Sequence, residues 1–347
     1  MLFNSTALLI DAFVAKIRDG YRRTYGGWKS QYSEILAWAG SMALENIANS
    51  DALYHTVDHT IWVTLAGQEI IRGKHIREGG VSPEDWLHYI ISLLFHDIGY
   101  VKGVCTGDRG GFYATGNGNE TLQLPFGATD ASLMPYHVDR SKRFVEERFG
   151  GHQLIDVDIL KRNIEATRVP IPVDVPLGDP GDYPALVRAA DFLGPLSDPG
   201  HLHRLAALFY EMEETGAARS RGYYSPADLR DHFLDTFWSA IEPHTRPARH
   251  YLELTQQGKQ IIANLHANLF TIEHGSRQGR LGQSSGGSPL GTIAPSPAGG
   301  HQDPALPQGA EEGESGGSCS SLQESAARVA RLLNQRKRQA ELPTSIS

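Results

Sequence analysis

The chain has 347 residues, of which 40% are hydrophobic and 21% are charged, so it is long enough to bury a sizeable core in one large domain or two. Its formal net charge of −8 at pH 7 argues against nucleic acid and anionic membranes as partners, because both attract basic surfaces. The two cysteines, Cys105 and Cys319, lie far apart, which argues against a disulfide framework and suits a reducing compartment.

The first residues, MLFNSTALLIDAFVAKIRDG, predict a helix and no signal peptide. No cationic segment precedes their apolar residues, and Asp11, Lys16 and Arg18 interrupt the hydrophobicity early. Nowhere does the sequence contain the roughly 18 uninterrupted apolar residues that a membrane span needs. We therefore expect a soluble, cytoplasmic protein.

Helical spacing of apolar residues dominates the sequence as far as residue 273, whereas the strict alternation typical of strands is hard to find. Two boundaries carry strong start signals, Ser82-Pro83-Glu84-Asp85 and Ser225-Pro226-Ala227-Asp228, since each offers an N-cap, a proline at the first helical position and an acid for the helix dipole. The prediction is an all-α, multi-helix domain spanning residues 1–273. Its expected helices cover residues 5–20, 31–47, 57–73, 83–97, 137–149, 156–167, 183–193, 201–214, 226–241 and 246–272.

Two irregular segments interrupt this pattern. The first, CTGDRGGFYATGNGNETLQLPFGATD, predicts a long loop with a short hairpin around Gly116 to Gly118; a functional lid and a mobile insertion both fit such a loop. The second, VPIPVDVPLGDPGDYP, contains five prolines and is expected to be a connector.

After about Gly275 the composition changes to glycine, serine and proline. This segment has too few large apolar residues to offset the conformational entropy that it would lose on folding. Residues 274–347 are therefore expected to be a disordered tail. Within it, Leu322 to Leu342 regains helical periodicity; this short amphipathic helix would either dock on a partner or on the chain itself, or remain solvated and transient.

Ionisable residues occur at three places within apolar helical patterns. His55 and His59 are four apart and share a helix face, His96 and Asp97 end the apolar run in LLFHDIGY, and Asp191 lies within LVRAADFL. Buried carboxylates are costly unless compensated, and a metal cation is the strongest compensator. Imidazole and carboxylate together suit Mn, Fe, Zn, Ni or Mg better than calcium. LLFHDIGY alone also fits a simple helix end, in which His96 complements the dipole and Asp97 begins a turn.

The order of these residues, His59, then His96-Asp97, then Asp191, resembles the H…HD…D signature of the HD-domain superfamily of metal-dependent phosphohydrolases. YHTVDHT is similar to the YHNxxHA motif of class I cyclic-nucleotide phosphodiesterases. IEATR at 164–168 is similar to the ATDM segment of that family, and RAADFL followed by SDP at 197–199 is similar to its HxADLSNP segment. The resemblance covers about residues 50–200 and implies that His59, His96, Asp97 and Asp191 are metal ligands and that His55 donates a proton to the leaving group.

The sequence also departs from that motif pattern. HDxxHxG is replaced by HDIGYV, with Tyr100 where the wider superfamily commonly has lysine, and no purine-gripping glutamine can be located. The resemblance therefore supports a metallohydrolase more strongly than a cyclic-nucleotide substrate.

Further residues are candidates for the same site. Because members of the superfamily often place another histidine between the HD pair and the last aspartate, His137 is a candidate for a second metal or for the phosphate, and Asp139 could orient its ring. Lys102 and Arg168 are candidate phosphate contacts, which would supply local positive charge on an acidic chain. His201 and His203 could reach a cleft near Asp191, but a surface position at a helix start is favoured.

The expected function is hydrolysis of a phosphate ester of a nucleotide or related small molecule, monoester or diester, with one or two divalent cations lowering the pKa of bound water to about 7. The alternative is a degenerate HD module that binds metal and a nucleotide-like ligand in signalling without turnover. A phosphate loop and an HExxH motif are absent from the sequence, and no G-x-S-x-G elbow between a strand and a helix is predicted, which argues against those enzyme classes.

Overall fold

Helical periodicity in the sequence corresponds to helices in the structure. The computed structural model describes residues 4–171, 179 and 181–283, with side chains described as far as residue 275. The predicted helices 31–47, 137–149 and 201–214 are found with the same bounds as Gln31–Ile47, His137–Phe149 and His201–Glu214. The prediction of an all-α fold is confirmed for the described residues, apart from one sheet of two short strands.

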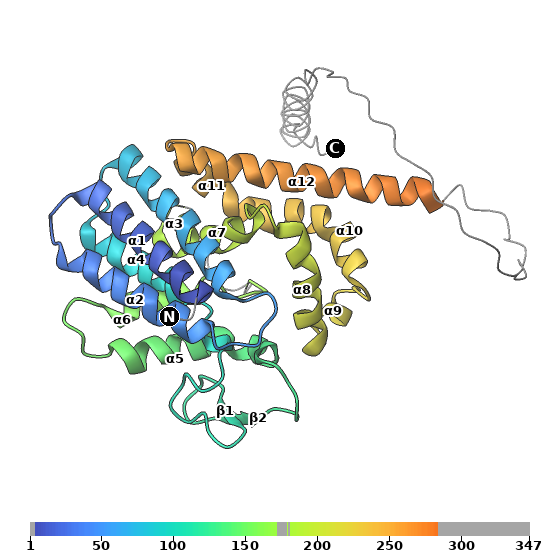
Figure 1. Ribbon diagram of the computed structural model, residues 1–347, viewed down its shortest axis with the longest axis horizontal. Helices are drawn as coiled ribbons and strands as arrows, with labels where there is room; N and C mark the ends of the chain where they lie inside the picture. Colours follow the sequence, from blue (N-terminus) through green and yellow to red (C-terminus); the bar gives the residue numbers. More distant parts are fainter. Residues whose placement is uncertain (1–3, 172–178, 180, 284–347) are drawn as a thin grey trace, which may run out of the picture. The chain divides into compact units, whose positions relative to one another are not determined.

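The helices are numbered along the chain in Figure 1. They are α1 Ser5–Tyr25, α2 Gln31–Ile47, α3 Val57–Glu78, α4 Pro83–Phe95, α5 His137–Phe149, α6 Val157–Glu165, α7 Tyr183–Leu196, α8 His201–Glu214, α9 Ala217–Ser220, α10 Pro226–Thr236, α11 Glu242–Leu252 and α12 Gln256–Gln283. Short 3₁₀ turns cover Ile98–Tyr100 and Asp130–Tyr136, and a π-helical turn covers Phe237–Ile241. Both proline start signals are confirmed, because Ser82 accepts from the backbone N–H of Asp85 and Ser225 from that of Asp228.

The other seven predicted helices differ from the structure in their bounds, and three of these differences concern where a helix ends or divides. The helix expected at 83–97 ends at Phe95, so His96 and Asp97 follow its last turn. The one expected at 226–241 is α-helical only to Thr236. The one expected at 246–272 is two helices, because Thr255 caps the start of α12 by accepting from the N–H of Gly258, while its hydroxyl donates to Glu69 on α3.

The long loop contains the expected hairpin. Strands β1 (Phe112–Ala114) and β2 (Thr121–Gln123) pair antiparallel, with Tyr113 opposite Leu122, and the connection between them includes Gly116 and Gly118. Both glycines have positive φ, which explains why the sequence of this turn is rich in glycine.

Helix α3 lies at the centre of the packing, against α4, α7 and α11 (Figure 1). Its contact with α7 is close because Gly194 has no side chain: a Cβ there would lie 2.5 Å from the Cα of Val63. This approach sets the distance between the start of α3 and the middle of α7, where His59 and Asp191 lie. Fully buried residues of α4, among them Trp86, Tyr89 and Leu93, fill the core beside them.

Helices α8, α9 and α10 add a smaller apolar cluster built around Phe209, Met212 and Leu229. Arg204 holds α8 beside α3, since its guanidinium pairs with Asp58 at 3.0 Å and with Asp198 at 2.5 Å. The described helices all fall into one compact unit of the chain.

Two sequence predictions fall mostly or wholly outside the described residues. Most of the five-proline connector and the amphipathic helix expected at 322–342 lie outside the described residues. The sequence predicts that the helical domain ends at residue 273, but the backbone of α12 continues to Gln283. In the part of the chain that is described, every helix is too short or too polar to cross a membrane.

Candidate metal centre

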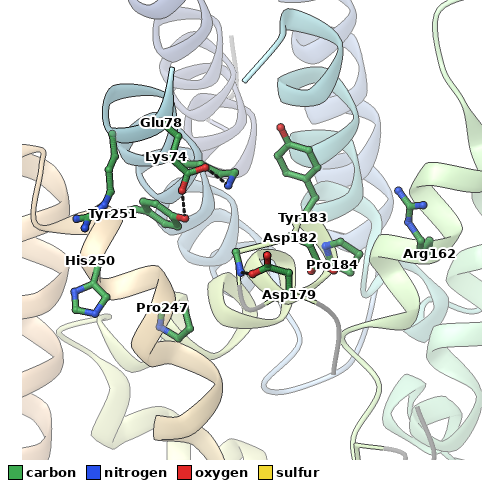
Figure 2. A pocket seen from close by; sticks show the side chains of 12 residues that line it. Lys74, Glu78, Arg162, Asp179, Asp182, Tyr183, Pro184, Pro247, His250 and Tyr251 are labelled. Atoms are coloured by element: carbon green, nitrogen blue, oxygen red, sulfur yellow. Dashed lines mark hydrogen bonds and ion pairs between the residues drawn. The ribbon is translucent and has the colours of Figure 1, made fainter. Parts of the chain in front are cut away.

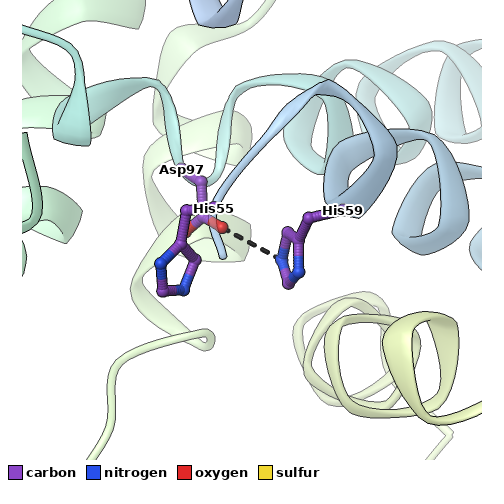
Figure 3. Close-up of side chains that lie close together, drawn as sticks. All are labelled: His55, His59 and Asp97. Carbon is purple, nitrogen blue, oxygen red and sulfur yellow. Dashed lines mark ion pairs between the residues drawn. The ribbon is translucent and has the colours of Figure 1, made fainter. Parts of the chain in front are cut away.

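The predicted ligands come from three separate elements that meet at one point. His59 lies in the first turn of α3, His96 and Asp97 follow α4, and Asp191 lies in the second half of α7. His59 and His96 are buried, Asp97 is buried and Asp191 is nearly so. Figure 3 shows Asp97 facing His59, with His55 beside them.

The interatomic distances define a tight cluster. Asp97 Oδ2 lies 3.1 Å from His59 Nε2 and 3.0 Å from His96 Nε2. Asp191 Oδ1 lies 3.6 Å from His59 Nε2 and 3.3 Å from His96 Nε2. Two overlapping sets of groups are close enough to hold an ion: His59, His96 and Asp191, and His55, His59 and Asp97.

Several buried atoms of this cluster make no hydrogen bond. They are both ring nitrogens of His59, Nε2 of His96 and Oδ2 of Asp97. Unpaired buried polar atoms are rare in folded proteins and call for an explanation such as an ion. The residues therefore fit a divalent cation, since imidazole nitrogens and carboxylate oxygens converge there without hydrogen-bond partners among the described residues.

The ring of His96 is oriented for such a role. Its Nδ1 donates to the backbone carbonyl of Leu93 at 2.8 Å, and since a carbonyl only accepts, the proton must be on Nδ1. Nε2 is then the nitrogen that faces Asp97 and Asp191, and in the neutral ring it carries a lone pair. Metal-bound histidines commonly have this arrangement.

The acids and histidines of the cluster favour each other's charged forms. The pKa of Asp97 and of Asp191 is lowered, and the pKa of His59 and of His96 is raised. Burial lowers the pKa of His96, but Asp97 and Asp191 outweigh burial and raise it well above its ordinary value. Burial raises the pKa of Asp97, whereas His96, His55 and His59 together bring it well below its usual range. The pKa of Asp191 falls to about 2 against the effect of burial, chiefly through His96. Both carboxylates are therefore anionic at neutral pH and stabilise positive charge at this point.

His55 has a partner that the sequence did not reveal. Its Nδ1 donates to Glu211 Oε2 at 2.5 Å, and the second oxygen of Glu211 accepts from the backbone N–H groups of Tyr54 and His55. Burial raises the pKa of Glu211, but the charge and hydrogen bonds of His55 and the two N–H groups lower it overall. Glu211 is followed by Glu213 and Glu214, so nothing in the local sequence of α8 distinguishes it from its solvent-facing neighbours.

Tyr100 connects His55 and His137. Its ring stacks on that of His55 at 4.1 Å between centroids and on that of His137 at 4.6 Å. The structure thus brings His137 to the centre, where its Nε2 lies 3.8 Å from Asp97 Oδ1. Asp97 therefore presents Oδ2 to His59 and His96 and Oδ1 to His137.

The placement of His137 depends on Gly99. Helix α5 packs against the turn that follows His96 and Asp97. There the hydroxyl of Ser141 donates to the carbonyl of His96 at 2.7 Å and accepts from the N–H of Gly99 at 2.9 Å. A Cβ on Gly99 would lie 2.0 Å from the carbonyl oxygen of His137, so only glycine fits.

Gly99→Ala is accordingly expected to destabilise the protein by about 1–3 kcal/mol, because rigid backbone must move to admit the methyl group. Urea unfolding of wild type and variant measures this difference. Gly80→Ala is the matched control, because a Cβ there meets nothing within 4 Å. Equal losses in the two variants would contradict the close approach of α5.

Three further candidate residues, Asp139, Arg168 and Lys102, do not make the contacts that the sequence suggested for them. Asp139 does not orient His137: it pairs with Arg168 and Lys142 at 2.8 Å each, while Nδ1 of His137 donates to the carbonyl of Met134 at 2.6 Å. Arg168 is also held by Glu165 at 2.5 Å.

Lys102 donates to the carbonyl of Ala128 at 2.6 Å and lies 3.4 Å from Asp130. Neither Lys102 nor Arg168 lines the cavity at the cluster, and acids beside them already engage both side chains. Their positions do not support the expected contact with phosphate. The expectation for His201 is also wrong, because it is 2% exposed and lines that cavity, whereas His203 is exposed.

A cavity of about 290 Å³ opens onto the cluster. One side is formed by the residues described above, and the other by apolar side chains of α7, α8, α10 and the π-helical turn. The apolar side consists of Phe192, Leu208, Met212, Leu229, Phe233 and Ile241.

A larger pocket, of about 770 Å³, lies away from this centre among residues of α3, α7 and α11 (Figure 2). Two of its charged groups pair with each other, since Lys74 lies 2.5 Å from Glu78, and the hydroxyl of Tyr251 donates to Glu78. None of the residues predicted for the site lines this pocket. The smaller cavity is therefore the better candidate for chemistry.

Fold and site together define an all-α protein with a buried His/Asp cluster that could hold a metal ion. The chain belongs to the Npun_R2479-like family, whose model matches residues 3–275. A search of curated proteins found no match, and neither did a search of solved structures. The matched range includes every residue of the cluster.

Proposed function

We propose that the protein is a metal-dependent phosphohydrolase of the HD type, acting on a small phosphate ester. The observation that carries this proposal is the juxtaposition of two features: buried, unpaired nitrogen and oxygen atoms of His59, His96 and Asp97, and the paired imidazole and carboxylate of His55 and Glu211. A cation site beside a potential proton donor is the minimum that hydrolysis of a phosphate ester requires.

His59, His96, Asp97 and Asp191 would hold the cation, with nitrogen and oxygen donors that suit Mn, Fe, Zn, Ni or Mg. When bound, a divalent cation supplies an acidified water and positive charge for phosphoryl oxygens. The second oxygen of Asp97, which faces His137, is available for a second cation.

His55 is the proposed proton donor. Glu211 holds the proton of Nδ1, which leaves Nε2 as the nitrogen that gives a proton to the leaving oxygen. The carboxylate of Glu211, whose pKa is lowered overall, accepts from this ring and from two backbone N–H groups, so it fixes the orientation of His55. Tyr100, stacked on the ring, restricts its rotation.

A metal- and ligand-binding module without turnover is the second candidate. One observation favours it: among the residues that line the cavity, Arg221 is the one lysine or arginine, so phosphate would depend on the cation for nearly all of its charge neutralisation. The two candidates differ in whether release of product depends on His55.

His55→Ala is expected to lower turnover by about 10²–10⁴-fold while leaving the metal content unchanged, because the residue moves a proton and leaves the four ligands in place. Elemental analysis and initial rates on one panel of phosphomonoesters, cyclic nucleotides and nucleoside phosphates, with added Mn or Mg, measure both quantities. His203→Ala, an exposed histidine on α8, is the matched control.

Loss of metal from the His55 variant would make His55 a ligand and remove its assignment as proton donor. Metal binding by the wild type without turnover on any compound would favour the binding module.

A further inference from the structure

His201 is a buried imidazole whose ring makes no well-formed hydrogen bond among the described residues, although the carbonyl of Pro195 lies close to it. It lies in the first turn of α8, is 2% exposed, and both ring nitrogens are without a hydrogen-bond partner. A buried polar group left unpaired costs about 1–3 kcal/mol, so such groups nearly always have a partner.

The nearest acid is already engaged. Asp198 pairs with Nε of Arg204 at 2.5 Å, and its other oxygen accepts from the N–H of Gly200 at 2.8 Å. The side of the His201 ring is covered by Phe233, with 5.2 Å between ring centroids. His201 therefore faces an apolar surrounding on one side and the cavity of the metal centre on the other.

The imidazole is uncharged at neutral pH. Burial lowers the pKa of His201 to about 4, with the carbonyl of Pro195 and the charge of Asp198 opposing the shift and Arg204 adding to it. A neutral ring has one donor and one acceptor. It suits a hydroxyl, carbonyl or amide and does not neutralise an anion.

We infer that the substrate is a phosphate ester whose leaving group is largely apolar and carries one uncharged hydrogen-bonding group, which pairs with His201. This inference rests on the proposed function, because the phosphate is assigned to the metal centre. Apolar residues of α8 and α10 would surround the body of the leaving group. His201 would favour leaving groups that carry a hydrogen-bonding group over wholly apolar ones of similar size. A cavity of about 290 Å³ limits the substrate to a small molecule.

The test uses three phosphonates that cannot be hydrolysed: benzylphosphonate, 4-(hydroxymethyl)benzylphosphonate and 4-carboxybenzylphosphonate. Isothermal titration of the full chain with added Mn²⁺ gives the affinity of each. We expect the hydroxylated compound to bind about tenfold more tightly than benzylphosphonate, which is the contribution of one buried hydrogen bond. The carboxylate separates pairing with Arg221 of the cavity lining from pairing with His201.

In His201→Leu the preference for the hydroxyl should disappear, and in His201→Gln, which retains a donor and an acceptor, it should persist. His203→Leu is the matched control and should behave as wild type. Without any ligand, His201→Leu should unfold at the same or a higher temperature than wild type, since it removes an unpaired polar group.

Absence of the preference in wild type, or its survival in His201→Leu, would overturn the inference. So would a marked loss of stability in His201→Leu, because His201 would then have a partner within the protein. Failure of the hydroxylated compound to bind has the same consequence.

These outcomes are separate from failure of the proposed function. If hydrolysis requires Asp97 but His201 has no effect on the preference for the hydroxylated compound, only the proposed substrate class is wrong. Discrimination by His201 in a protein that binds no Mn²⁺ would leave a ligand pocket and remove the hydrolase.

Discussion

Asp97→Ala is expected to remove the bound metal and to lower turnover by at least about 10³-fold, since a catalytic cation contributes several kcal/mol to transition-state stabilisation. Asp97 contacts both histidines of the cluster through Oδ2 and faces His137 through Oδ1. Its two oxygens face different histidines, so it is placed to serve two cation positions. Its loss should therefore affect both.

The measurement is elemental analysis of purified wild type and Asp97→Ala, with the same samples assayed for release of phosphate or nucleotide in the presence of Mn or Mg. Asp158→Ala is the matched control, because that aspartate side chain is 95% exposed on α6. An Asp97 variant with a full metal load would contradict the assignment of the cluster. If wild type holds no metal under any of these conditions, the His-Asp pair reverts to a buried helix end.

Arg140→Met is expected to lower the free energy of unfolding by about 3–5 kcal/mol, because it leaves the buried carboxylate of Asp108 without its charged partner. Arg140 is 0% exposed. Its guanidinium donates to both oxygens of Asp108, at 3.1 and 2.8 Å, and to the carbonyls of Gly99, Val101 and Ala114. It thereby fastens the first half of the long loop, and the turn after Asp97, to α5.

Urea unfolding at pH 7 measures the loss, and Arg230→Met, which removes an exposed arginine of α10, is the matched control. A difference below 1 kcal/mol between the two variants would contradict the structural role of Arg140.

The difference between wild type and Arg140→Met should shrink as the pH falls below about 4, the ordinary pKa of aspartate. In wild type, burial raises the pKa of Asp108, but the hydrogen bonds and charge of Arg140 lower it overall, so the pair contributes stability above that pH and loses it in acid. In the variant, the unpaired carboxyl becomes easier to protonate, which relieves the destabilisation. A difference that stays constant down to pH 3 would show that the ion pair is not its cause.

The residues of the buried His/Asp cluster could be selected from the sequence, whereas their environment could not. Acids and histidines at the ends of apolar helical runs are visible as breaks in a periodic pattern, which is why His59, His96, Asp97 and Asp191 could be selected. Glu211 could not, because it is separated from His55 by 156 positions and is flanked by acids of the same kind.

The surroundings of Lys102 and Arg168 could not be predicted either. Their charge suggested contact with phosphate, but nearby acids pair with them in the folded chain, and a pairing of this kind depends on side chains that become neighbours only through packing. Arg140 illustrates the same point, since an arginine among Asp139, Ser141 and Lys142 gives no sign of being fully buried.

The sequence by itself determined the all-α class, most helix positions and the residue types of the candidate metal centre, because helix formation and capping depend on residues a few positions apart. Only the tertiary structure decided which carboxylate pairs with His55, that Tyr100 stacks between two histidines, and that His201 is buried at the cavity. Those facts depend on α3, α5, α7 and α8 approaching one another, and the distances involved are set by packing at positions such as Gly99 and Gly194.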